Sequence, residues 1–253
     1  MQKRIDTVNA YIQSRDEVRL SELEKLLPNV SSMTLRRDLE FLEKQGEIIR
    51  IRGGARSIKS LSKKMIREDV YSGRMQENPE GKKIIGRKAS LLISENESIY
   101  IDSGTTAMCM AEKLPDISLA VLTCAPNTAI ELTGRKNVEI VLAGGSLSKE
   151  NYSVSGVVTA DFINNTNIDT AFLSTSGFSP ETGFTCGSLN ECEIKKAVIA
   201  KAKKIVLMMD KHKIDVRHMF TFAWLDDIDV IVTDEPFPAH ILKLIKEKNI
   251  KII

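Results

Sequence analysis

From Gly81 onward, apolar strand-like runs alternate with helical stretches, and no other feature of the sequence constrains the fold as strongly. The runs are ESIYID, SLAVLT, VEIVLA, DTAFLST, KIVLMMD, VIVTD and IKII. The stretches between them include TTAMCMAEKL, NTAIELTG, NECEIKKAVIAKA and PAHILKLIKEK. Apolar strands that alternate with helices are typical of a parallel sheet covered by helices on both faces. We therefore expect an α/β domain over residues 79–253.

The first 58 residues follow a different pattern, which predicts a small domain of three helices and a hairpin. The first helix is marked by aliphatic residues at helical spacing, namely Ile5, Val8 and Ile12. A short extended piece follows at residues 18–20. The capping-box motif S-E-L-E then predicts that the second helix begins at Ser21, with Glu24 completing the cap.

The third helix and the hairpin complete this first domain. Ser31 is a suitable N-cap and Gly46 a suitable C-cap for a helix whose buried stripe is Leu35, Leu39 and Leu42. Two short strands then flank a Gly-Gly turn at residues 53–54. The following residues are polar and show no sustained period, so we interpret residues 59–78 as a linker between a domain at 1–58 and the α/β domain.

Charge is distributed unevenly along the 253 residues. The first 64 residues hold 14 Lys and Arg against 9 Asp and Glu, whereas the remainder holds 22 against 25. A basic N-terminal region followed by a mildly acidic remainder favours a nucleic-acid partner. No apolar run approaches the roughly 18 residues that span a bilayer, and the four Cys and three His show no metal-ligand spacing. We expect a cytoplasmic, soluble protein with reduced thiols and neither metal nor cofactor.

Polar and basic side chains near the start of the third helix are those that a reader of the DNA major groove needs. They are Ser31, Ser32, Thr34, Arg36 and Arg37. Arginine offers two parallel donors to guanine, and hydroxyls suit phosphate oxygens. The hairpin adds a basic wing with Arg50, Arg52, Gly53, Gly54 and Arg56. An ordinary three-helix subdomain with a solvated arginine face is the alternative.

The segment VSSMTLRRDLEFLEKQGEIIRIRGGA, from Val30 to Ala55, resembles the DNA-binding signature of the DeoR family of bacterial transcription regulators. The family pattern V-S-x-x-T-[IVL]-R-[RK]-D-L is followed by a glycine and a basic hairpin that ends in G-G-A. YSGRMQENPEGKKIIGRKA also resembles the family's linker and the first helix of its second domain. The resemblance implies a winged helix-turn-helix that binds double-stranded operator DNA.

A small-residue loop follows the strand at residues 99–101, and its residues are Asp102, Ser103, Gly104, Thr105 and Thr106. Such a turn between a parallel strand and a helix exposes backbone N–H groups, and the adjacent hydroxyls make it suitable for a phosphate. Ligands of open α/β sheets bind at these carboxyl ends. The loop matches neither G-x-x-x-x-G-K-[ST] nor G-x-G-x-x-G, which disfavours a nucleotide. A plain capped turn is the alternative.

The resemblance gives this loop a role, because D-S-G-T-T is similar to the phosphate loop of the family's effector domain. That domain is similar in fold to ribose-5-phosphate isomerase and glucosamine-6-phosphate deaminase. The resemblance also implies effector contacts from Asn127, Gly145 and Lys213. Lys213 could neutralise a phosphate or pair with Asp102. His212 stands where the family has a serine.

Two further segments have more than one interpretation. The loop between Gly177 and Gly183 either borders the ligand cleft or is a simple surface turn. Glu193 and Lys196 are expected to be solvated charges on a helix face rather than site residues.

These observations predict a sequence-specific transcription regulator, a repressor of a sugar-metabolism operon, that responds to a phosphorylated sugar. It is expected to form a homo-oligomer, a dimer or a tetramer, because reader helices act on paired half-sites. The alternative is a sugar-phosphate isomerase with an appended DNA-binding domain. Such an enzyme needs a general base, for which Asp102 or Glu193 is available, but no second carboxylate or histidine follows a strand in a recognisable spacing. We therefore expect no enzymatic activity.

Overall fold

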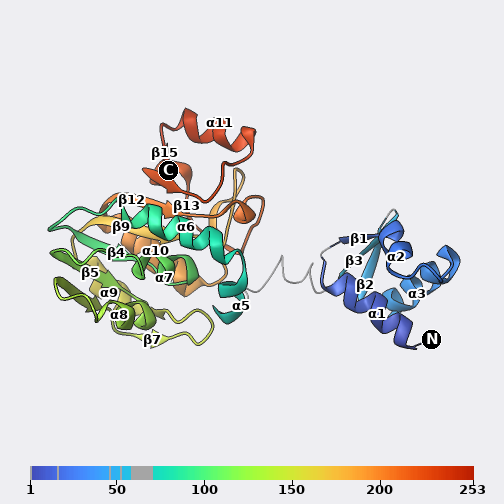
Figure 1. Cartoon of the computed structure of the whole chain (residues 1–253). Helices are drawn as coiled ribbons and strands as arrows, with labels where there is room; N and C mark the ends of the chain where they lie inside the picture. The colour runs from blue at the N-terminus through green and yellow to red at the C-terminus, as the bar shows by residue number, and fades with distance from the viewer. Residues whose placement is uncertain (1, 16, 46, 52, 58–70) are drawn as a thin grey trace. The chain divides into compact units, whose positions relative to one another are not determined.

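The structure is a computed structural model of the chain, and it describes residues 2–15, 17–45, 47–51, 53–57 and 71–253. Contacts divide the chain into two compact units, residues 1–67 and 68–253 (Figure 1). Across the described residues, no helix is both long and apolar enough to cross a membrane.

The described residues of the first unit form three helices and a three-stranded antiparallel sheet in the order β1-β3-β2. Its elements are α1 (Gln2–Gln13), β1 (Glu17–Arg19), α2 (Leu20–Leu26), α3 (Ser32–Lys44), β2 (Ile48–Ile51) and β3 (Gly54–Ser57). The apolar stripes of all three helices meet in one core, to which β1, β2 and β3 also contribute. This arrangement confirms the predicted helices and hairpin, including Ser31 as the N-cap of α3.

The predicted start of the second helix is wrong. Helix α2 begins at Leu20, because β1 ends at Arg19 and the chain turns there at once. The carboxylate of Glu22 accepts the N–H of Arg19 at 2.7 Å, which is the contact expected between Glu24 and Ser21. Gly46, the predicted C-cap of α3, lies outside the described residues.

The second unit is built on a seven-stranded, wholly parallel sheet in the order β15-β14-β12-β9-β4-β5-β6. Its strands are β4 (Ser98–Ile101), β5 (Leu119–Thr123), β6 (Val138–Leu142), β9 (Ile168–Ser174), β12 (Ala202–Met208), β14 (Val230–Val232) and β15 (Lys251–Ile252). Each apolar run named in the sequence forms one of these strands, so the predicted α/β class is confirmed.

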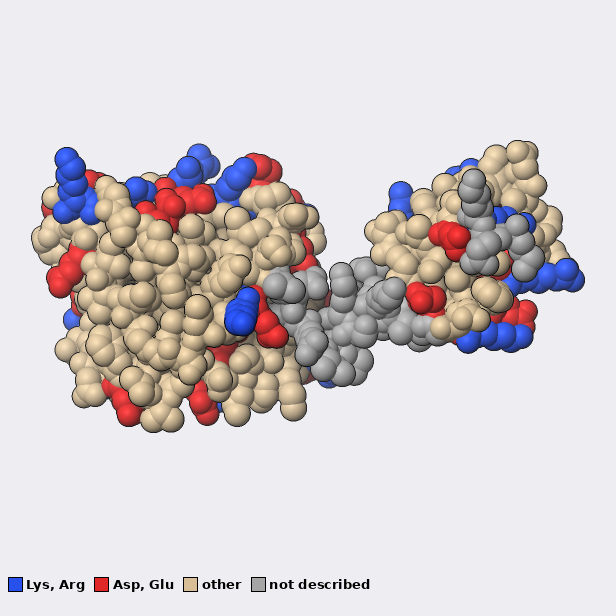
Figure 2. Space-filling view, turned by 90° about the horizontal axis from the view of Figure 1, so that it is seen from below, with Lys and Arg blue, Asp and Glu red and all other residues tan. Residues whose placement is uncertain are grey.

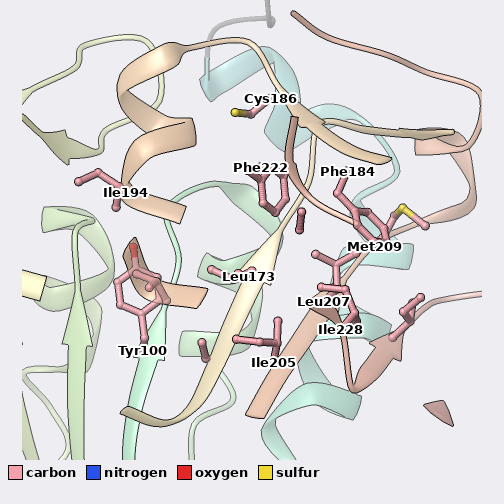
Figure 3. Close-up of a cluster of buried hydrophobic side chains, with 14 of the residues drawn as sticks. Tyr100, Leu173, Phe184, Cys186, Ile194, Ile205, Leu207, Met209, Phe222 and Ile228 are labelled. Atoms are coloured by element: carbon pink, nitrogen blue, oxygen red, sulfur yellow. The ribbon is translucent and has the colours of Figure 1, made fainter. Parts of the chain in front are cut away.

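Helices cover both faces of the sheet. The helices whose buried residues pack with one face are α6 (Pro79–Ser90), α7 (Thr105–Ala111) and α8 (Pro126–Leu132). Those that pack with the other face are α9 (Val157–Asn164), α10 (Leu189–Lys201) and α11 (Ala239–Glu247). Each face of the sheet has its own core, because side chains alternate along the strands. Tyr100 and Leu173 lie in the core beneath α9, α10 and α11, which we call the second core (Figure 3), and Phe172 lies in the first core, beneath α6, α7 and α8.

A smaller antiparallel sheet packs on the second core, in the order β10 (Gly177–Ser179), β11 (Gly183–Cys186) and β13 (Phe220–Ala223). The segment between Gly177 and Gly183 is therefore part of a hairpin, in which residues 180–182 form the turn and Glu181 is exposed. Phe178 and Phe184 are buried and their rings stack at 4.5 Å between centroids. A short hairpin, β7 (Ser146–Leu147) with β8 (Val154–Ser155), precedes α9.

The strand order places a crevice at the carboxyl ends of β4 and β9. These two strands are neighbours, but the chain leaves β4 toward β5 and leaves β9 toward β12, on the opposite side. Loops that diverge from adjacent parallel strands leave room between them, and this is where open α/β sheets bind ligands.

Candidate functional site

The N-terminus of α3 is held by its own hydroxyls. The Ser31 Oγ accepts the N–H of Thr34 at 3.3 Å, and the two hydroxyls lie 2.9 Å apart. The Ser32 hydroxyl donates to the Glu24 carboxylate of α2 at 2.6 Å. These contacts fix the first turn of α3 against α2, which is the geometry of a helix-turn-helix.

Two arginines project from the surface of α3. Arg36 and Arg37 are exposed, and within the described residues neither guanidinium has a hydrogen bond or ion pair. The next residue, Asp38, is buried and accepts two hydrogen bonds from Arg4 of α1, at 2.6 and 2.9 Å. The helix is thus anchored on one side and presents unpaired cations on the other.

The hairpin of β2 and β3 uses both glycines for backbone reasons. Gly53 has φ of +88°, which favours glycine. At Gly54 an added Cβ would lie 2.1 Å from the Val18 carbonyl oxygen, so the strands β1 and β3 need its small size. Arg50 pairs with Glu43 of α3 at 2.6 Å, which fastens the hairpin to that helix. Arg52 and the side chain of Arg56 lie outside the described part of the chain.

A pocket of about 430 Å³, part of it open to solvent, lies in the crevice beyond β4 and β9. Loops after both strands contribute to it, together with α10, the hairpin region before β8, α6 and the short helix α5 (Tyr71–Gln76). The residues that line it are Arg74, Lys82, Ser103, Gly104, Thr105, Thr106, Asn151, Ser174, Thr175, Ser176, Glu191 and Lys213. Its wall is polar and holds three cations and one carboxylate.

Four of the five residues predicted from D-S-G-T-T line this pocket. Gly104 has φ of +106°, a conformation that side chains rarely adopt, and its carbonyl accepts the first hydrogen bond of α7, from Met108. Ser103 and Thr105 on either side are buried, while Thr106 is half-buried. The loop therefore turns hydroxyl groups and backbone toward one cavity.

Three cations come from three separate elements: Arg74 of α5, Lys82 of α6 and Lys213 of a 3-10 turn. Lys82 is only 2% exposed, and its ammonium donates to the carbonyl of Arg74 and, at 2.6 Å, to that of Glu77. Burial and the nearby charge of Lys213 lower the pKa of Lys82. A desolvated ammonium whose charge is only partly compensated is a suitable partner for an anion.

Asp102 lies beneath the pocket and is paired with a lysine that we did not predict as a site residue. Its carboxylate accepts the N–H and the hydroxyl of Ser174, both at 2.8 Å, and forms an ion pair with the buried ammonium of Lys195. Lys195 also lies 3.3 Å from Glu191. Burial acts to lower the pKa of Lys195, but the carboxylates of Asp102 and Glu191 outweigh it and raise the pKa.

The pairing of Asp102 with Lys195 corrects one expectation about Lys213. Lys213 does not pair with Asp102; its ammonium lies 3.4 Å from the Glu77 carboxylate at the pocket's edge. Since Asp102 is 2% exposed and its Oδ2 is shared by three donors, it is poorly placed to act as a general base.

A second hollow, of about 210 Å³ with part of it open to solvent, adjoins the pocket and shares Ser103 and Glu191 with it. Its other lining residues are Tyr100, Asp102, Cys124, Ser153, Val154, Ser155, Ile194 and Lys195. Burial raises the pKa of the Cys124 thiol to about 11, so this thiol stays protonated near neutral pH. All four cysteines are free and buried, as expected.

The remaining predicted effector residues are not brought into the pocket. Asn127 donates to the Tyr71 hydroxyl at 2.9 Å, which connects α8 to α5. Gly145 has φ of +149°, and an added Cβ would lie 2.2 Å from the Thr159 hydroxyl, so it allows a close approach of the loop after β6 to α9. Among the described residues there is no group of His, Cys, Asp and Glu that could hold a metal.

Sequence reasoning missed eight of the residues that build the pocket and its base: Arg74, Lys82, Asn151, Ser174, Thr175, Ser176, Glu191 and Lys195. A signal existed for the last two. Glu191 and Lys195 share a helix stripe with the apolar Val198, at i, i+4 and i+7, and a charged pair on an apolar stripe indicates a buried ion pair. Glu193 and Lys196 are exposed, as expected for solvated charges.

Comparison with protein families agrees with both halves of the structure. The DeoR-like helix-turn-helix domain matches residues 4–61, and the DeoR C terminal sensor domain matches residues 77–235. The chain belongs to the DeoR family of transcription regulators. Membership confirms the predicted DNA-binding regulator with an effector domain, and the family's proteins are regulators rather than enzymes.

Several transcription regulators match the chain over most of their own length. The chain is 34% identical to the HTH-type transcriptional regulator GlpR of Haloferax volcanii, over 88% of this chain and 86% of that protein. It is 30% identical to GolR of Listeria innocua (95% and 93% covered) and to the HTH-type transcriptional repressor GlcR of Bacillus subtilis (92% and 88%). The solved ribose 5-phosphate isomerase A of Methanocaldococcus jannaschii matches 55% of each chain, at 14% identity and a TM-score of 0.41.

Proposed function

We propose that this DeoR-family protein is a repressor of a sugar-metabolism operon, and that a phosphorylated sugar in the pocket beyond β4 and β9 modulates its affinity for DNA. The observation that carries the proposal is the pocket itself, in which three cations and a loop rich in hydroxyls face one carboxylate. One relative is named a repressor, which supports the direction of regulation.

The distribution of charge in the pocket suits a ligand with two different ends. Arg74, Lys82 and Lys213 supply positive charge for a phosphate, and the hydroxyls of Ser103, Thr105 and Thr106 supply hydrogen-bond donors. The carboxylate of Glu191, beside the amide of Asn151, offers acceptors for the hydroxyls of a sugar. Inorganic phosphate would leave these acceptors unused. The roles of Asp102, Asn127 and Gly145 are then to shape the site rather than to contact the ligand.

On the DNA side, α3 enters the major groove with its first turns. Arg36 and Arg37 are exposed and unpaired there, and Ser31, Ser32 and Thr34 lie at the helix N-terminus near the phosphates. The hairpin with Arg50, Arg52, Gly53 and Gly54 follows the backbone as a wing. A cytoplasmic homo-oligomer, a dimer or a tetramer, places two such helices on operator half-sites.

Regulation then follows from linkage. A ligand shifts an equilibrium only by the difference in its affinity for the two states, so the sugar phosphate must favour the arrangement of the oligomer that fits DNA poorly. Its binding releases the operator, and depletion of the sugar restores repression.

The proposal is tested by thermal melting of the full chain with a panel of phosphorylated sugars, with the unphosphorylated sugars as controls. At least one phosphorylated sugar should raise the melting temperature, and the double variant Thr105→Val with Thr106→Val should lose that increase while still binding DNA in gel shifts. Thr133→Val, an exposed threonine of α8's end, is the matched control and should behave as the wild type. A ligand-induced increase that persists in the double variant would show that the pocket is not the site.

A further inference from the structure

Met33 is 64% exposed, more than any other large apolar residue among the described residues of the first unit. It lies in the first turn of α3, between Ser32 and Thr34. A single exposed apolar residue is ordinary on most surfaces, but this one lies in the part of a helix-turn-helix that contacts base edges. Lys and Arg side chains project from the first unit at several points (Figure 2), and they suit a polyanion. Met33 therefore adds an apolar group to a surface suited to phosphates.

The periodicity of α3 places Met33 on the side of the helix that faces away from the core. Leu35, Leu39 and Leu42 are buried and mark the inner side. At about 3.6 residues per turn, Met33 lies nearly opposite to them. The next residues on its own side follow at three and four positions, so they are its direct neighbours. The exposed residues of this outer side are Met33, Arg36, Arg37, Glu40 and Lys44, of which Met33 alone carries no charge.

The first turn of α3 holds the backbone of Met33 in place, because the residues on either side are tied by hydrogen bonds. The Ser32 hydroxyl donates to Glu24 of α2 at 2.6 Å, and the Thr34 N–H donates to the Ser31 hydroxyl at 3.3 Å. Methionine is unbranched, so its side chain adapts to the shape of an apolar neighbour. A flexible apolar side chain at a fixed backbone position suits contact with one small group of a partner.

The base edges of the major groove carry one apolar group, the 5-methyl group of thymine. The other groups there are hydrogen-bond donors and acceptors, with which a thioether forms at most weak contacts. If Met33 covered such a group, it would displace water without replacing the hydrogen bond, which is unfavourable. Packing on a methyl group instead removes apolar surface of both partners from water. The side chain of Met33 thus favours thymine over the other bases.

We propose that Met33 determines sequence specificity by packing on the 5-methyl group of a thymine in the major groove of the operator. The Cβ atoms of Met33 and Arg37 are about 5–6 Å apart along the helix, as are those of Met33 and Arg36, and stacked bases follow every 3.4 Å or so. The thymine therefore lies within about two base pairs of the base that the arginine reads. The inference rests on the proposed entry of α3 into the major groove and adds one base to what this helix reads.

The test uses the full-length protein and a duplex that it selects from a random pool. Each thymine of one half-site is replaced in turn by deoxyuridine, which removes only the 5-methyl group, and gel shifts at one salt concentration measure the affinity. One replacement should weaken binding by the wild type about fourfold, the factor expected for the loss of one buried methyl group. Met33→Ala should bind the thymine duplex and this deoxyuridine duplex equally, because the contact is then absent from both.

Phe41→Ala is the matched control, since Phe41 is the other exposed large apolar residue of α3 and lies two turns later, nearer the C-terminus of the helix. It should keep the fourfold difference, and thermal melting checks that both variants remain folded. A wild type that is indifferent to deoxyuridine at every thymine, or a Met33→Ala variant with an unchanged ratio, would overturn the role of Met33 alone. Failure to select any duplex would overturn the entry of α3 into the groove as well.

Discussion

The cations of α3 are exposed to solvent, whereas two lysines in and below the pocket are buried. Arg36 and Arg37 are exposed and unpaired within the described residues, whereas Lys82 and Lys195 are 2% and 1% exposed and hydrogen-bonded. The arginines remain hydrated until a partner arrives. The lysines lose water when the protein folds, so the fold itself must compensate them.

The difference indicates what kind of ligand each region can hold. A hydrated, mobile cation suits a large polyanion. Neutralising many phosphates releases counterions, and such binding tolerates small errors in the position of each cation. A buried cation held by carbonyls and carboxylates suits a small anion of fixed shape, for which each hydrogen bond counts. Substitutions in the two regions should therefore affect different observables.

The largest effect is expected at Lys195. Lys195→Met leaves Asp102 buried without its counter-charge, which should lower the free energy of unfolding by about 3–5 kcal/mol in urea denaturation. Lys203→Met is the control, because its pair with Asp169 is at the surface, where the ammonium is 77% exposed, and its loss should change little. Equal effects of the two substitutions would remove the distinction between buried and exposed charges.

Next come the two arginines of α3. Arg36→Ala and Arg37→Ala should leave stability unchanged and weaken operator binding, by about 1–3 kcal/mol for the one that reads a base. Gel shifts on operator and on unrelated duplex DNA separate base reading from phosphate contact. Arg87→Ala, an exposed arginine of α6, serves as control. If both α3 variants bind the operator as the wild type does, α3 is not the reading helix.

At the pocket, Lys82→Met should weaken binding of the phosphorylated sugar by about tenfold or more, through loss of one charge-assisted hydrogen bond. Isothermal titration calorimetry measures the change. The neighbouring Lys83→Met is a matched control, since Lys83 is 57% exposed and pairs with Glu80 away from the pocket. Identical losses in both variants would argue for a general charge effect rather than a contact.

The smallest effect is a dependence on pH. Burial lowers the pKa of Lys82 in the free protein, and a bound dianion should raise it, so the complex takes up protons. Affinity should then fall as the pH rises from the free value of that pKa toward the bound one. Binding heats in buffers of different ionisation enthalpy report the proton uptake, which Lys82→Met should abolish.

Much of this architecture was predictable because short-range rules determine it. The strands follow from their apolar runs, and Ser31 caps α3 because serine at that position satisfies a free N–H. The same kind of rule failed at Ser21, since pairing of β1 with β3 places the cap two residues earlier, at Arg19, and lets Glu22 make the capping contact. Tertiary pairing there outweighed a local motif.

The pocket's cations were harder to predict, because they come from helices whose charged residues look alike in sequence. Lys82 and Lys83 are adjacent, yet one is buried and the other exposed. Only the rotation of α6 on the sheet decides between them, and that rotation depends on packing with α7. The D-S-G-T-T loop was predictable because a strand, a glycine with positive φ and a helix start coincide within a few residues.

The buried Lys82 connects the pocket to the end of α5. Its ammonium donates to the carbonyl of Arg74 in α5 and to that of Glu77 just after the helix, and α5 is the first described element after the connecting segment. One of its three protons remains for a ligand. A ligand that accepted this proton, as proposed above, would share one nitrogen atom with the end of α5. A ligand that changed the hydrogen bonds of this ammonium would loosen or tighten the end of α5 directly, without any rearrangement of the sheet.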